Sequence, residues 1–102
     1  MITVYHNPDP TFRVTAEAMA AFREGKFKKV AEVVSDTFPE GVPAEQLLEE
    51  AFALTNSALS PWETNPAAGA IGTGHRSTSV GDVIVSQHGA FMVAGVGFTP
   101  LP

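Results

Sequence analysis

Cysteine is absent from this 102-residue sequence, and so is any apolar run long enough to cross a membrane. The first absence excludes disulfides, thiolate chemistry and cysteine-based zinc sites, and it fits a reducing compartment. The first ten residues contain neither a basic segment nor an apolar stretch, so no signal peptide is expected there. We therefore expect a cytoplasmic protein that does not act on a membrane.

Lysine and arginine are scarce and unevenly placed. Six of them face eleven acids, which gives a net charge of -5, and none lies between positions 31 and 74. That range holds seven of the acids: Glu32, Asp36, Glu40, Glu45, Glu49, Glu50 and Glu63. Such asymmetry indicates either an interaction surface or a pair of solvated faces. Six basic groups neutralise few phosphates, so direct binding to nucleic acid is not expected.

The length and the hydrophobic fraction of 44% predict a single domain, residues 1–102, with one modest core. Its first half alternates strand and helix signals. Residues 2–5 predict a strand, which the prolines of residues 7–10 end. Thr15 suits the N-cap of a short helix over residues 15–24, and β-branched residues then predict a strand over 27–34, with an irregularity at Ala31.

The clearest helix is predicted over residues 43–56, with Pro43 in its first position. Asn56 ends it, since asparagine tolerates a left-handed cap. Its apolar face is expected to pack on a sheet and to bury Leu47, Leu48, Ala51 and Phe52. Its acidic face is a candidate partner-binding surface formed by Glu45, Glu49 and Glu50.

A C-terminal β-hairpin is predicted, with strands over residues 83–86 and 90–98 and a turn at 87–89. Gly89 can supply a positive φ in that turn. The predicted fold class is therefore α+β: a small antiparallel sheet, the main helix packed on it, the hairpin, and the short second helix.

The segments "VAEV", "AFALTNS", "PWETNP" and "RSTSVGDVIV…GF" resemble small proteins encoded by phages and plasmids, mainly of actinobacteria. The last segment is similar to the YodL-like domain, and the resemblance covers roughly residues 27–101. The matching positions are Arg76, Ser77, Ser79, Val80, Gly81, Asp82, Val83, Gly97 and Phe98. The resemblance implies an accessory protein of a mobile element, and such proteins often act by binding a host or partner protein.

The residue types of a hydrolytic triad occur in this segment and directly before it: His75, Ser77, Ser79 and Asp82. Triad members usually come from separate elements, whereas these lie within eight residues of one another. We interpret them as structural. Arg76 is expected to pair with Asp82 or to cap the carboxyl end of the main helix, while the serines and Asp82 fix a turn by bonding to backbone. Gly81 is expected to adopt a conformation that other residues resist.

No metal and no cofactor are predicted. The three histidines, His6, His75 and His88, are not spaced as a ligand set. Gly72-Thr73-Gly74 lacks the remainder of a phosphate-binding loop and is interpreted as part of a flexible connection over residues 58–75.

Trp62, the only tryptophan, has two interpretations: a plug of the core beside the main helix, or a partly exposed binding anchor. The nearby Asn56 and Asn65 can tie its loop down through backbone hydrogen bonds. The leading functional hypothesis is a non-enzymatic protein that binds another protein. The alternatives are an acidic DNA mimic that inhibits a nucleic-acid-binding protein and, third, a small hydrolase or metal protein. The oligomeric state is left open.

Overall fold

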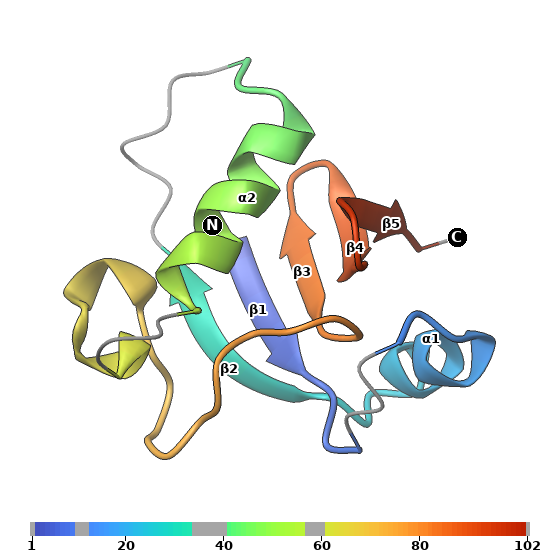
Figure 1. Ribbon diagram of the computed structural model, residues 1–102, viewed down its shortest axis with the longest axis horizontal. Coiled ribbons are helices and arrows are strands. Elements are labelled where there is room, and N and C mark those ends of the chain that lie inside the picture. Colours follow the sequence, from blue (N-terminus) through green and yellow to red (C-terminus); the bar gives the residue numbers. More distant parts are fainter. Residues whose placement is uncertain (1, 10–12, 34–40, 57–60, 102) are drawn as a thin grey trace.

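The computed structural model describes residues 2–9, 13–33, 41–56 and 61–101, and it confirms the α+β class (Figure 1). The described residues form two α-helices and five strands. Two single-turn 3₁₀ helices, Trp62–Thr64 and Pro66–Ala68, lie between the second α-helix and the third strand. The main elements follow in this order: β1 (Ile2–His6), α1 (Ala16–Arg23), β2 (Lys28–Val33), α2 (Ala44–Leu54), β3 (Val83–Ser86), β4 (Gly89–Val93) and β5 (Phe98–Pro100). None of the helices in the described residues is long and apolar enough to span a bilayer.

The strands form one antiparallel sheet in the order β2-β1-β3-β4-β5. The predicted hairpin of β3 and β4 is confirmed, with Val83 opposite Met92 and Gly89 at φ +112°. The predicted return strand over residues 90–98 is wrong in extent. It ends at Val93, a turn follows, and Phe98 begins β5. The break occurs because Gly97 adopts φ +71° and the Ala94 N–H donates to its carbonyl, which reverses the chain.

A β-bulge lies where β1 meets β2. Val4 faces Ala31 and Tyr5 faces Lys29, so Val30 is the extra residue, one position from the predicted irregularity. Because of the bulge, Val30 and Ala31 both belong to the core cluster on the α2 side, whereas strict alternation would point them to opposite faces of the sheet.

Both predicted helices form, with small differences at their ends. Thr15 caps α1 by accepting a hydrogen bond from the Ala18 N–H at 3.0 Å. In α2, Pro43 is the N-cap rather than the first helical residue. The helix ends at Leu54 with Thr55, not the predicted Asn56, as its C-cap, and the Thr55 hydroxyl donates to the Ala51 carbonyl.

The two helices cover opposite faces of the sheet. Alternate strand residues point to opposite sides, so each face contributes its own set of apolar side chains to the core under one helix. Against α2 lie Ile2, Val4, Ile84 and Val93, among others. Against α1 lie Val83 and Met92, beside an aromatic row of Tyr5, Phe22 and Phe27. On α2 the predicted core residues Leu47, Leu48 and Ala51 are buried. Phe52 is only half-buried, which corrects its expected full burial, because its side of α2 borders a groove described below.

Both edges of the sheet are protected. Residues 69–71 cover β2, where the Ile71 N–H donates to the Val30 carbonyl and the Glu32 N–H donates to the Gly69 carbonyl. Gly69 is needed for this approach, since a Cβ at this position would overlap the Glu32 carbonyl oxygen. At the other edge, β5 contains Pro100, which has no N–H to offer another strand.

Candidate functional site

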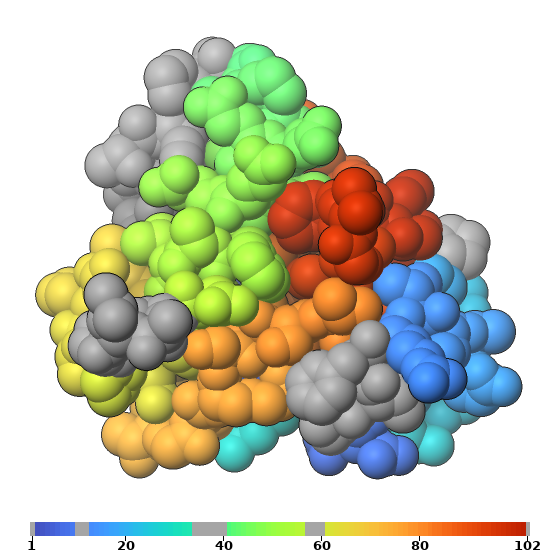
Figure 2. Space-filling view, in the orientation of Figure 1, coloured from blue at the N-terminus to red at the C-terminus, as the bar shows by residue number. Residues whose placement is uncertain are grey.

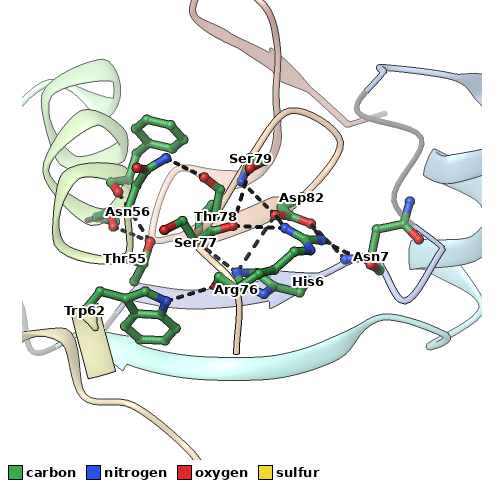
Figure 3. A network of polar contacts seen from close by, with 12 residues as sticks. His6, Asn7, Thr55, Asn56, Trp62, Arg76, Ser77, Thr78, Ser79 and Asp82 are labelled. Atoms are coloured by element: carbon green, nitrogen blue, oxygen red, sulfur yellow. Dashed lines mark hydrogen bonds and ion pairs between the residues drawn. The ribbon is translucent and has the colours of Figure 1, made fainter. Parts of the chain in front are cut away.

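A buried carboxylate, Asp82, is the centre of a polar network at the entry to β3 (Figure 3). The Arg76 guanidinium donates to both of its oxygens, at 2.6 and 2.7 Å. The backbone N–H groups of Asn7 and Ser79 add bonds at 2.9 and 2.8 Å. The carboxylate therefore keeps its charge compensated and its oxygens bonded, as a buried charge requires.

Arg76 joins three segments through this contact. Besides Asp82, it donates to the carbonyls of Ser77 and of Asn7, which follows β1. Of the two roles predicted for Arg76, the pairing with Asp82 is confirmed. The special conformation of Gly81 is also confirmed: its φ is +96°, and its N–H donates to the Val93 carbonyl.

His6 extends the network at the end of β1. Its Nε2 lies 2.9 Å from the Thr78 hydroxyl and 3.8 Å from the nearer Asp82 oxygen. Burial lowers the pKa of His6 to about 4; Asp82 and Glu63 oppose this shift, while Arg76 and His75 add to it. His6 is therefore neutral at pH 7, so its approach to Asp82 is a contact between a neutral ring and a carboxylate.

Trp62 is 4% exposed and belongs to the core cluster that α2 covers. Its indole N–H donates to the Arg76 carbonyl at 2.9 Å, and the His75 ring stacks on it with centroids 6.3 Å apart. Of the two interpretations of Trp62, the structure therefore agrees with the one that places it in the core. The anchor interpretation needs an exposed ring, which the packing of His6 and His75 against the indole prevents.

The same segment is fastened to the end of α2. The Asn56 amide donates to the Thr78 carbonyl at 2.7 Å, and the Thr78 N–H donates to the Thr55 carbonyl at 2.9 Å. The predicted use of Asn56 as a tie is thus observed. Asn65 instead bonds locally, to the Ala67 N–H.

The side chains with catalytic potential have structural partners. The Ser79 hydroxyl donates to the Ser77 carbonyl, and the His75 ring bonds the Ile71 carbonyl. Thr78, which contacts His6, is fully buried. The residues that resemble a triad in the sequence are therefore not arranged as nucleophile, base and orienting acid. Across the described ranges, no group of three or more His, Asp or Glu side chains could hold a metal ion.

No family model, curated protein or solved structure matches the chain.

A groove of about 300 Å³ runs between α2 and the turn that joins β4 to β5. In Figure 2, α2 (green) and this C-terminal segment (red) lie side by side on the same face. We call this groove the α2–β5 groove. Its lining residues are Glu49, Phe52, Val80, Val93, Ala94, Gly95, Gly97 and Phe98. Val96, at the tip of the turn, is 96% exposed.

One of the predicted partner-binding glutamates of α2 lines this groove. Glu45, Glu49 and Glu50 are all exposed, and Glu49 lines it. Among the described residues, the ion pairs take Glu24, Glu32 and Asp82, so the three glutamates of α2 have no basic partner there. The sequence indicated these glutamates. It did not indicate the turn that faces them, because residues 90–98 resemble one continuous strand.

Proposed function

We propose that this is a non-enzymatic accessory protein that binds another protein through the α2–β5 groove. The observation that carries the proposal is the juxtaposition of a largely apolar groove, an exposed valine at its rim and the exposed carboxylate of Glu49. Contiguous apolar surface with a polar rim is characteristic of protein interaction sites.

The polar network supports a binding role by holding this face in place. Gly81 bonds to Val93, a groove residue, and Asp82 accepts the Val93 N–H through its carbonyl. The network also fixes the C-terminal end of α2 through Asn56. One wall of the groove thus belongs to a helix and the other to a hairpin, and both are fastened to the same buried segment.

The resemblance to YodL-like proteins adds to the proposal. Of the matching residues, Val80, Gly97 and Phe98 line the groove. On this proposal the gene belongs to a phage or plasmid, and the protein acts in the cytoplasm of the host.

Site-specific photocrosslinking tests the proposal. A benzophenone amino acid at Val96 should form an adduct with a protein in the cell in which the gene is naturally expressed. The same group at Glu17, an exposed residue of α1 on the opposite face, is the control. Adducts of equal yield from both positions, or none from Val96, would overturn the proposal. An adduct with a nucleic-acid-binding protein that DNA displaces would instead establish the mimicry alternative.

A further inference from the structure

The shape of the α2–β5 groove limits what it can hold. Its volume of about 300 Å³ is at the lower end of the range of ligand pockets, about 300–1,000 Å³. Phe52, Val93 and Phe98 supply its apolar lining, and each is at least half-buried. An inserted apolar side chain fits this environment better than a polar cofactor does.

The charges around the groove favour a partner segment with positive charge. Glu45 and Glu49 lie four residues apart on α2, so they form a ridge along one helix face, and Glu49 reaches the groove itself. No residue of the lining is basic. Four of the basic residues, Arg23, Lys26, Lys28 and Lys29, belong instead to α1, β2 and the turn between them.

We propose that the occupant is a segment of a partner protein that presents a large apolar side chain with lysine or arginine within one helical turn of it. The apolar side chain enters between Phe52 and Phe98, and the cation pairs with Glu49. This inference rests on the proposed function and specifies the chemistry of the partner. A nucleic acid does not fit, because its phosphates would face the carboxylates.

Gly95 offers a way to close the groove without disturbing the fold. It lines the groove, its φ is not positive, and a Cβ built there meets nothing within 4 Å. Gly95→Leu should therefore fold and place a bulky side chain at the wall of the groove, while Gly95→Ala is the matched control that leaves most of the space open.

The test is selection from a random peptide library displayed on phage, with counter-selection against Gly95→Leu. Peptides retained by the wild type and by Gly95→Ala, but lost by Gly95→Leu, should carry lysine or arginine within four residues of a large apolar side chain. One of these peptides, labelled for fluorescence anisotropy, should bind Glu49→Gln about two- to fivefold more weakly. The control Glu17→Gln should bind it like the wild type.

Groove-dependent peptides without basic residues, an unchanged affinity for Glu49→Gln, or no peptide that depends on Gly95 would each overturn this inference. These results are distinguishable from failure of the proposed function. A crosslinked partner at Val96 together with non-basic peptides refutes only the partner chemistry. Basic groove-binding peptides without a crosslinked partner refute only the cellular role.

Discussion

Arg76 donates one hydrogen bond to each carboxylate oxygen of Asp82. The Asp82 side chain is fully buried, and the Arg76 side chain is about one-third exposed. The pair joins two residues that are six positions apart and, through the Asn7 backbone, connects them to the end of β1. A contact that is local in sequence thereby fixes the meeting point of β1, β3 and the segment that fastens α2.

Asp82→Asn tests this arrangement. The amide retains one acceptor oxygen but loses the charge that holds Arg76, so we expect the free energy of unfolding to fall by about 2–3 kcal/mol. Chemical denaturation followed by Trp62 fluorescence measures it. Asp9→Asn, at an exposed position, is the matched control and should change stability by less than about 0.5 kcal/mol. If Asp82→Asn is as stable as the control, the network is not structural.

The buried His6 makes stability depend on pH. Its pKa is lowered to about 4 in the folded protein, against about 6.5 when unfolded, so the unfolded chain binds more protons between these values. The contribution of neutral His6 to the free energy of unfolding is fully present above pH 6.5. It is lost as the pH falls to 4, by about 3 kcal/mol in all.

His6→Gln removes this titration and can still bond to the Thr78 hydroxyl. Unfolding free energies measured from pH 7 to pH 4 should therefore decline less steeply in this variant than in the wild type. Every other residue is the same in both proteins, so the difference between the two pH curves isolates His6. If the unfolding free energies of the two proteins change with pH in parallel, the pKa of His6 is not lowered in the folded protein.

Gly69→Ala should destabilise the cover over β2. The new methyl group would overlap the Glu32 carbonyl, which is backbone and cannot rotate away, so we expect a loss about 2 kcal/mol larger than for Gly25→Ala. The control has a similar positive φ but meets nothing within 4 Å, so the difference isolates the clash. Equal losses on thermal unfolding would argue against the close approach of residues 69–71 to β2.

The face of α2 gives a graded prediction. Leu48→Ala should cost about 2–5 kcal/mol, because the side chain is fully buried among core residues. Phe52→Ala should cost less than the usual 3–5 kcal/mol for a buried phenylalanine, since half-burial leaves part of its ring at the groove. Denaturation midpoints in the opposite order would mean that the groove is closed in solution.

Local signals in the sequence were sufficient for most of the elements. Thr15 and Gly25 bound the first helix, the spacing of Leu47, Leu48 and Ala51 predicts α2, and the turn between β3 and β4 lies where its residues place it. The pairing of Arg76 with Asp82 was also foreseeable, because the two residues are six apart and a turn lies between them. Two residues this close in the sequence can meet only through a local turn, and the turn can be recognised from the residue types between them.

The sequence by itself thus determined the fold class, the faces of the helices and the local ion pair. Only the tertiary structure decided that His6 and Asn7 join a network more than 70 residues away, that the final strand breaks at residues 94–97, and that this turn faces Glu49 across a groove. The physical reason is that strand and helix periodicity depend on neighbours within a few residues. The order of strands in the sheet, and with it every long-range contact, depends on how two apolar helix faces are buried at once.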